Sequence, residues 1–228
     1  MKTVLGDELI GWEDFRGNQL LRCPKQKRIE AAYLLQMPND TVFIDVGSHF
    51  GDTVLTMAMY AKTHRPDIKF YACEPNSKKC DYIKKIAFLN KLDITLWNSC
   101  IGDKTGFCKP DGTRRESNGA CSFKPDPNGK TLMTTLDSLI PRLNNIGFIH
   151  IDTEGWESKV LKGATELLSR IKTKVYIVAE CWSNKVSIGR GFSATPSQDI
   201  LDEISKHNPT RLPDICDIER NLFFQIND

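Results

Sequence analysis

The sequence has no long apolar run and no strong imbalance of charge, and these absences exclude several classes of protein. No stretch of its 228 residues approaches the roughly 18 consecutive apolar residues of a membrane-spanning helix. Residues 1–15 contain acids where a secretory signal would need an apolar centre. The formal net charge is only +2, and no basic stripe with interleaved aromatic residues indicates a nucleic-acid partner. We therefore expect a soluble, cytoplasmic protein with no membrane insertion and no bound nucleic acid.

The sequence also lacks the cysteine spacing of a structural zinc site. Its eight cysteines contain no C-x-x-C pair. Several of them lie inside apolar segments, so we expect reduced thiols rather than disulfides. The cysteines are Cys23, Cys73, Cys80, Cys100, Cys108, Cys121, Cys181 and Cys216.

Internal repeats and low-complexity tracts are absent as well. The composition is 40% hydrophobic and 26% charged, as in ordinary globular proteins. A chain of 228 residues can bury one substantial core but is short for two. We therefore expect residues 1–228 to form a single domain.

The most informative segment is residues 41–53, TVFIDVGSHFGDT. Val42–Ile44 has the pattern of a buried strand, which runs into Asp45 and then into a turn with Gly47 and Gly51. Apolar residues at helical spacing follow, at Val54, Met57, Ala58 and Ala61. Glycine lets the backbone approach a ligand, and the free N–H groups at the helix start offer donors to it. The segment therefore predicts a nucleotide-binding corner, in which a glycine turn joins a strand to a helix.

The glycine spacing favours one nucleotide over another. A dinucleotide fold needs G-x-G-x-x-G to seat a pyrophosphate, and Asp45-x-Gly47-x-x-x-Gly51 lacks the central glycine. This D-x-G-x-x-x-G form resembles the first motif of S-adenosylmethionine-dependent methyltransferases, whose loop holds the methionine part of the cofactor. The alternative is a glycine turn without this role, as after the first strand of any parallel sheet. The resemblance implies cofactor contacts for Asp45, Gly47, Ser48, His49, Asp52 and Thr53.

The first 38 residues predict a helical cover. A basic segment, Arg22–Arg28, precedes apolar residues in a helical pattern that ends before Pro38. This helix is expected to cover the sheet edge or the cofactor site. We expect its lysines and arginines to form a solvated face rather than a binding patch.

A second strand, residues 68–73, ends at an acid. An acid at this position of a doubly wound fold can accept hydrogen bonds from both hydroxyls of a ribose. We therefore predict Glu74 as the ribose ligand, with Pro75 and Asn76 beside it. Asn76 or Ser77 can cap the helix that follows.

A third strand, residues 93–97, leads to a segment that would lie beside the adenosine. Asn98 and Ser99 are candidates for reading the adenine edge, and Ile101 is a candidate for packing on its face. The alternative interpretation is a plain turn closed by Gly102.

Two segments fit no regular element. Residues 104–130 are rich in Gly, Pro, Lys, Arg, Asn and Ser, and predict a loop or an irregular hairpin insertion. Such insertions often carry substrate recognition, although a surface excursion without a role fits equally well. Residues 183–196 form a glycine-containing loop suited to closing over the site as a lid. Thr195 to Gln198 then has a capping-box pattern that opens a helix.

Candidate catalytic residues lie in residues 146–157, IGFIHIDTEGWE. Alternation along the predicted strand places His150 and Asp152 on the same side as the strand ends. Asp152 is the leading candidate because it lies at the carboxyl end of the strand. Glu154 and Glu157 stand at the start of the next helix, where one or two of these acids serve only as caps. A single helix is expected, with the apolar face Val160, Leu161, Ala164, Leu167 and Leu168.

Two further strands complete the predicted sheet. The fifth, residues 174–179, ends at Glu180, another acid at a strand tip. The last, Leu222–Ile226, is short enough to be an edge strand.

The glycine corner after Asp45, the strand that ends at Glu74 and the third strand with its turn are followed by three sequence motifs. The motifs are Thr135-Leu136-Asp137, the phrase I-D-T-E-G-x-E at residues 151–157, and V-L-K-G-A at residues 160–164. Together these features resemble the FkbM family of methyltransferases. The resemblance covers residues 41–182 and implies a Rossmann-like class I methyltransferase fold: α/β, doubly wound, mostly parallel, with an antiparallel edge strand. It implies S-adenosylmethionine as the donor and a hydroxyl of a sugar, glycan or natural product as the acceptor. It leaves open whether the domain works with, or fused to, a glycosyltransferase.

The chain departs from the family pattern at His150, where family members often have lysine. Residues 1–38 and 104–130 lie outside the resemblance. The acceptor is therefore the feature that the resemblance predicts least well.

Methyl transfer to a hydroxyl benefits from a base near the methyl group. Asp152 is the predicted base, His150 is the alternative, and Glu180 is predicted to orient the acceptor. A divalent ion, Mg²⁺ or Mn²⁺, held by Asp152, Glu154 and Glu180 is a less favoured alternative. Three other readings stay open: a non-catalytic cofactor-binding subunit, a dinucleotide oxidoreductase, and a methyltransferase acting on a non-sugar small molecule or peptide.

Overall fold

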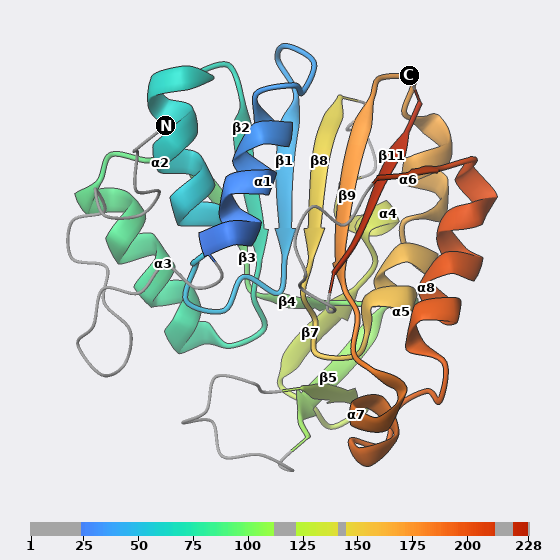
Figure 1. Ribbon diagram of the computed structural model, residues 1–228. Helices are drawn as coiled ribbons and strands as arrows, with labels where there is room; N and C mark the ends of the chain where they lie inside the picture. Colours follow the sequence, from blue (N-terminus) through green and yellow to red (C-terminus); the bar gives the residue numbers. More distant parts are fainter. Residues whose placement is uncertain (1–23, 112–121, 141–144, 213–220, 228) are drawn as a thin grey trace.

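The computed structural model describes residues 24–111, 122–140, 145–212 and 221–227 (Figure 1). Outside these ranges lie residues 1–23 of the predicted cover at residues 1–38, together with Cys23, Cys121 and Cys216. The other five cysteines are free thiols, as expected.

The main element is a seven-stranded sheet in the order β10-β11-β9-β8-β1-β2-β3. Its parallel strands are β1 (Val42–Val46), β2 (Lys69–Cys73), β3 (Ile94–Trp97), β8 (Ile146–Ile151) and β9 (Val175–Glu180). Strand β11 (Asn221–Ile226) runs antiparallel to β9, and β10 (Thr210–Arg211) pairs with β11. The predicted mostly parallel sheet with an antiparallel strand is confirmed. The expected edge position of β11 is wrong, because the two-residue β10 lies outside it.

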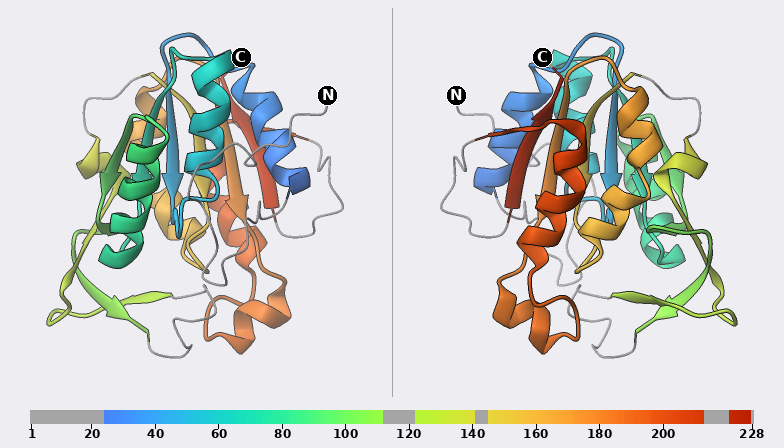
Figure 2. Two further views of the ribbon diagram at one scale, coloured as in Figure 1. Left: turned by 90° about the vertical axis from the view of Figure 1, so that its left-hand side faces the viewer. Right: turned by 90° about the vertical axis from the view of Figure 1, so that its right-hand side faces the viewer.

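Helices cover both faces of this sheet (Figure 2). Strand alternation sends Phe43 and Phe148 to one core and Ile44 and Ile149 to the other. The first core packs against α1 (Pro24–Leu34), α2 (Val54–His64) and α3 (Ser77–Leu89). The second packs against α4 (Leu136–Leu139), α5 (Glu157–Lys162), α6 (Thr165–Arg170) and α8 (Pro196–Ile204), the last followed by a 3₁₀ turn at Ser205–His207.

A second, four-stranded sheet lies near the carboxyl ends of the parallel strands (Figures 1 and 2). Its order is β4-β7-β5-β6, with β4 (Ser99–Ile101), β5 (Gly106–Pro110), β6 (Phe123–Pro125) and β7 (Thr131–Thr134). The described part of the predicted insertion is therefore antiparallel hairpin structure, as one expectation had it. The alternative of a plain turn at Gly102 is wrong, because the chain before it forms β4 in parallel pairing with β7.

The single helix expected after Gly155 is interrupted. Helix α5 ends where the Gly163 carbonyl accepts a hydrogen bond from the Asp137 N–H at 3.0 Å instead of continuing the helix. The Asp137 carboxylate then accepts from the N–H groups of Glu166 and Leu167, at 3.2 and 2.7 Å, and so caps α6. A Cβ on Gly163 would lie 2.0 Å from the Gly102 carbonyl oxygen, so only glycine fits where the second sheet passes.

Candidate active site

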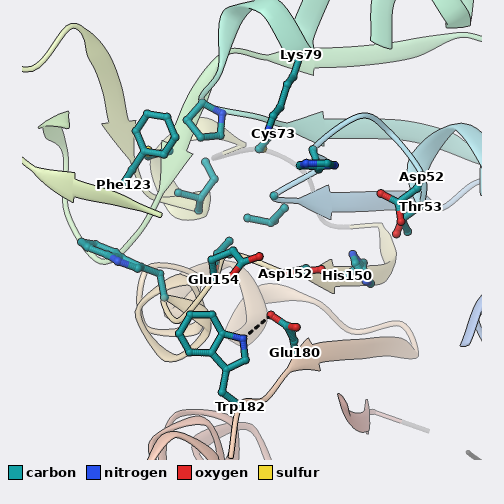
Figure 3. Close-up of a pocket in the computed structure, with 18 of the residues that line it drawn as sticks. Asp52, Thr53, Cys73, Lys79, Phe123, His150, Asp152, Glu154, Glu180 and Trp182 are labelled. Atoms are coloured by element: carbon teal, nitrogen blue, oxygen red, sulfur yellow. Dashed lines mark hydrogen bonds between the residues drawn. The ribbon is translucent and has the colours of Figure 1, made fainter. Parts of the chain in front are cut away.

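A cavity of about 720 Å³ opens where the two sheets meet (Figure 3). Its size falls within the range of small-molecule sites. Most of the predicted site residues line it: Gly47, His49, Asp52, Thr53, Pro75, Ser99, Ile101, His150, Asp152, Glu154 and Glu180. Five predicted residues stand outside the lining: Asp45, Ser48, Glu74, Asn76 and Asn98.

The glycine corner brings three strand tips together. Gly47 has a φ of +88°, and a Cβ there would lie 1.8 Å from the Asp152 carbonyl oxygen. The N–H groups of Gly47 and Ser48 both donate to the Cys73 carbonyl, at 2.9 and 3.1 Å. Glycine is therefore required for β1 to approach β8 while its turn is tied to β2.

Glu74 stabilises this corner through hydrogen bonds but does not itself line the cavity. Its two carboxylate oxygens accept hydrogen bonds from the N–H groups of His49 and Asn76, at 2.8 and 2.9 Å. Burial raises the pKa of Glu74 to about 7, although Lys79 opposes the shift. Asn76 caps α3 as predicted, accepting from the Lys78 and Lys79 N–H groups. The ribose role of Glu74 stays a prediction.

The wall beyond Glu74 is largely apolar. Ser99 and Ile101 line it with Cys73, Phe123 and Met133. The Ser99 hydroxyl is buried and has no hydrogen-bond partner among the residues that the structure describes. This orphaned group suits a polar atom of a ligand.

Asn98 does not reach that wall. Its side-chain amide donates to the carbonyls of Glu74 and Pro75, both at 2.9 Å. Asn98 therefore holds the tip of β2, and Ser99 is the better placed of the two for reading an adenine edge.

His150 lies between two acids. Its Nδ1 is 2.8 Å from Asp45 Oδ1, and its Nε2 is 3.5 Å from Glu30 Oε1 on α1. Burial alone would lower the pKa of His150, but the Glu30 charge and the Asp45 hydrogen bond outweigh burial and raise it. Both ring nitrogens of His150 face protein carboxylates, so His150 is the poorer of the two candidate bases.

Asp152, Glu157 and Glu180 each bring a carboxylate oxygen within 4.8 Å of the others. Burial, followed by the charges of Asp152 and Glu157, raises the pKa of Glu180 to about 10. Burial also raises the pKa of Asp152, against the opposing charge of His150. With a pKa of about 10, Glu180 holds a proton at neutral pH, beside an Asp152 carboxylate oxygen that lies within 4.8 Å. The Trp182 indole N–H donates to Glu180 Oε2 at 3.0 Å and fixes its orientation (Figure 3).

The remaining acids of this motif have structural partners. Glu157 Oε1 accepts from the Thr153 N–H, the Thr153 hydroxyl and the Gly155 N–H, all in the loop before α5. The predicted capping role is wrong for Glu157, because α5 has no side-chain cap and Glu157 instead holds the loop that precedes it. Glu154 instead pairs with Arg190, with 2.7 Å between Oε2 and Nη1. The expected metal-ligand set is therefore corrected: Glu157, not Glu154, is grouped with Asp152 and Glu180.

The predicted lid loop contains a helix, α7 (Asn184–Gly189). Arg190 follows it and lies over the Trp182 ring, with 3.6 Å between the guanidinium carbon and the ring centroid. Trp182 also meets Phe192 edge to face. The capping box expected at Thr195 is wrong, since its hydroxyl donates to the Asp199 side chain and makes no cap hydrogen bond.

Sequence reasoning missed Lys27 on α1. The expected solvated face is wrong for this lysine, whose side chain is only 3% exposed and lines the cavity, whereas Arg28 is exposed as expected. The sequence did contain a signal for this burial: Lys27 and Glu30 stand three residues apart in an apolar helical pattern, and such a pair can be buried together. Trp182 and Arg190, which also line the cavity, stand within or next to segments already singled out.

A doubly wound sheet that gathers a glycine corner and several acids around one cavity defines the Rossmann-like methyltransferase class. Residues 45–208 match the family model described as the methyltransferase FkbM domain. The match covers well over half of the chain, which therefore belongs to the FkbM family of methyltransferase domains. No curated protein matches the sequence.

Solved structures share the fold at low sequence identity. A methyltransferase FkbM from Methylobacillus flagellatus is 17% identical with a TM-score of 0.54; the match covers 81% of this chain and 44% of that one. The chain thus spans less than half the length of that protein. An O-methyltransferase from Bacillus cereus in complex with SAH is 10% identical with a TM-score of 0.55, covering 90% and 81%. A putative O-methyltransferase from Klebsiella pneumoniae is 11% identical with a TM-score of 0.53, covering 90% and 80%.

Within the described ranges, no helix combines the length and the apolar character needed to cross a membrane.

Proposed function

We propose that the protein transfers a methyl group from S-adenosylmethionine to a hydroxyl group of a sugar or glycan. The observation that carries this proposal is the half-buried pair of Asp152 and Glu180, whose carboxylate oxygens come within 4.8 Å of each other at neighbouring strand tips. Burial and the charge of Asp152 raise the pKa of Glu180 to about 10, so Glu180 is the member of the pair that keeps a proton. The pair lines the cavity beside the tip of β1. A hydroxyl needs a base of this kind, whereas a more nucleophilic amine or thiol does not need one to the same degree.

The cavity has features that fit the cofactor. Gly47 and Thr53 of the glycine corner line the cavity, and the apolar wall at Ile101 and Phe123 suits an adenine ring. The orphaned Ser99 hydroxyl on this wall suits a nitrogen of the base. When bound, the cofactor supplies an electrophilic methyl group on a sulfonium.

Asp152 is the proposed base, and Glu180 is its positioning residue. Glu180, whose carboxyl group lies within 4.8 Å of Asp152, keeps its own proton and orients Asp152, which accepts the proton of the acceptor hydroxyl. As the oxygen–methyl bond forms and the sulfur–methyl bond breaks, that proton ends on Asp152. Trp182 holds Glu180 in place through its indole N–H.

The lining beside this pair supports a sugar acceptor. Glu154, Ser183 and Arg190 offer several hydrogen-bonding groups, and Trp156 and Trp182 add apolar surface. This mixture suits a polyhydroxylated ring, which has both apolar faces and many hydroxyls. A non-sugar small molecule or a peptide with a hydroxyl is the competing acceptor class.

Methyl transfer to a panel of neutral sugars, measured with S-adenosylmethionine labelled in its methyl group, tests the proposal. Label should enter a sugar and resist mild alkali, as an ether does and a carboxyl ester does not. The matching deoxy-sugar, which lacks the modified hydroxyl, should take up no label. Label found only in hydroxylated non-sugar compounds or peptides would overturn the sugar assignment.

A metal-assisted reaction at Asp152, Glu157 and Glu180 is the second candidate. Carboxylates suit Mg²⁺ or Mn²⁺. However, one Glu157 oxygen already accepts three hydrogen bonds, and one Glu180 oxygen accepts from Trp182. We therefore favour the metal-free base. Turnover should survive dialysis against a chelator; a loss restored by Mg²⁺ or Mn²⁺ would favour the metal.

A further inference from the structure

Helix α1 places a buried ammonium group in the cavity wall. Lys27 is 2% exposed and lines the cavity, although α1 precedes the residues matched by the family model. A lysine is rarely buried unless a partner compensates its charge. Glu30, 0% exposed, is that partner, with 3.2 Å between Oε2 and Nζ.

The Lys27 ammonium keeps one donor for a ligand. An ammonium has three N–H donors. Among residues 24–111, 122–140, 145–212 and 221–227, Lys27 Nζ donates to Glu30 Oε2 and to Thr53 Oγ1. The third donor has no protein acceptor within the described ranges, and the side chain borders the cavity.

The cavity has two chemically different ends. Cys73, Phe123 and Lys79 lie on one side of Asp152, and Asp52 and Thr53 lie on the other (Figure 3). The apolar wall on the first side suits an adenine ring, which places the amino-acid part of the cofactor on the second. Lys27 belongs to this second end, because its ammonium contacts Thr53.

The second end also matches a zwitterion. Asp52 lines the cavity there, and its charge acts on Lys27. An ammonium and a carboxylate at one end of a cavity can receive the carboxylate and the ammonium of an amino acid. We propose that Lys27 binds the carboxylate of the amino-acid part of S-adenosylmethionine. This inference rests on S-adenosylmethionine being the methyl donor.

Binding of two cofactors, measured by calorimetry, tests the proposal. Decarboxylated S-adenosylmethionine differs from S-adenosylmethionine only in lacking this carboxylate. Lys27→Met, which keeps most of the stem and removes the charge, should weaken S-adenosylmethionine binding tenfold or more. It should change binding of the decarboxylated cofactor less than twofold. Arg28→Met, at the exposed neighbouring position, should change neither.

A second variant guards against a folding effect. Lys27→Met leaves the Glu30 carboxylate buried without its partner, so Lys27→Met/Glu30→Gln removes both charges together. The double variant should show the same selective loss. Equal weakening of both cofactors in both variants would make Lys27 a structural residue and overturn the proposal, as would no change. A wild-type protein that binds neither cofactor would instead overturn the methyl donor on which the inference rests.

Discussion

At the residue scale, environment assigns different roles to two neighbouring carboxyl groups. Asp152 and Glu180 both lie half-buried at the ends of parallel strands, where burial and the charge of Asp152 raise the pKa of Glu180 to about 10. The proton resides on Glu180. Asp152 therefore remains able to accept one.

Removing the proposed base should separate catalysis from cofactor binding. We expect Asp152→Asn to lower turnover by about two orders of magnitude, because asparagine keeps the shape but cannot accept the proton. Affinity for S-adenosylhomocysteine, measured by calorimetry, should stay within a fewfold of the wild type. Glu166→Gln, at an exposed glutamate that does not line the cavity, is the control. Unchanged turnover in Asp152→Asn would remove Asp152 from the mechanism.

The raised pKa of Glu180 makes stability depend on pH. Its folded pKa of about 10 lies above the ordinary value, so the native state keeps a proton that the unfolded chain releases. This contribution is full below about pH 4.3, the ordinary value for a glutamate, and is lost as the pH rises toward 10. Between pH 5 and pH 8 the wild type should lose about 1–3 kcal/mol of unfolding free energy relative to Glu180→Gln.

Denaturant unfolding at several pH values measures this difference. Glu166→Gln, at an exposed glutamate, should follow the wild type. Parallel stability curves for wild type and Glu180→Gln would show that Glu180 does not hold the proton.

At the element scale, the β1–α2 corner decides whether the cavity forms. Gly47 has a positive φ. In addition, the Asp152 carbonyl group occupies the space that a Cβ on residue 47 would need. Gly191 also has a positive φ, +77°, but nothing lies within 4 Å of its Cβ position. Substitution at Gly191 therefore measures the cost of backbone strain alone, and substitution at Gly47 measures strain together with a steric clash.

Alanine at these two positions should have unequal effects. Gly47→Ala should lower the unfolding free energy by about 3 kcal/mol or more, since strain and a clash add. Gly191→Ala, which adds strain alone, should cost about 1 kcal/mol. Equal losses in denaturant unfolding would show that β1 and β8 can separate to admit a side chain.

Several elements could be predicted because their signals are local. The buried strand before Asp45, the cap at Asn76 and the acid at the tip of β9 all follow from neighbouring residues. The break between α5 and α6 could not be predicted in the same way. It depends on Asp137 and on the Gly102 carbonyl, both distant in sequence from Gly163.

At the scale of the whole molecule, α1 belongs to the same structure as the matched domain. Tyr33 stacks on Tyr176 with 4.7 Å between ring centroids, and the Asn221 amide donates to Gln26 at 3.1 Å. The second contact joins the first and last described elements. The burial of Lys27 depends on this assembly, because α1 packs against β9 and β11 and Lys27 itself contacts Thr53. The spacing of Lys27 and Glu30 indicates a pair that can be buried together, but the elements that bury it are distant in sequence.

The central claim is that the cavity between the two sheets binds S-adenosylmethionine, and thermal unfolding with and without S-adenosylhomocysteine tests it most directly. At about 100 times its dissociation constant, the ligand should add about 2.7 kcal/mol to the unfolding free energy and raise the melting temperature, whereas NAD should not. No shift with S-adenosylhomocysteine, or a shift with NAD alone, would contradict the account.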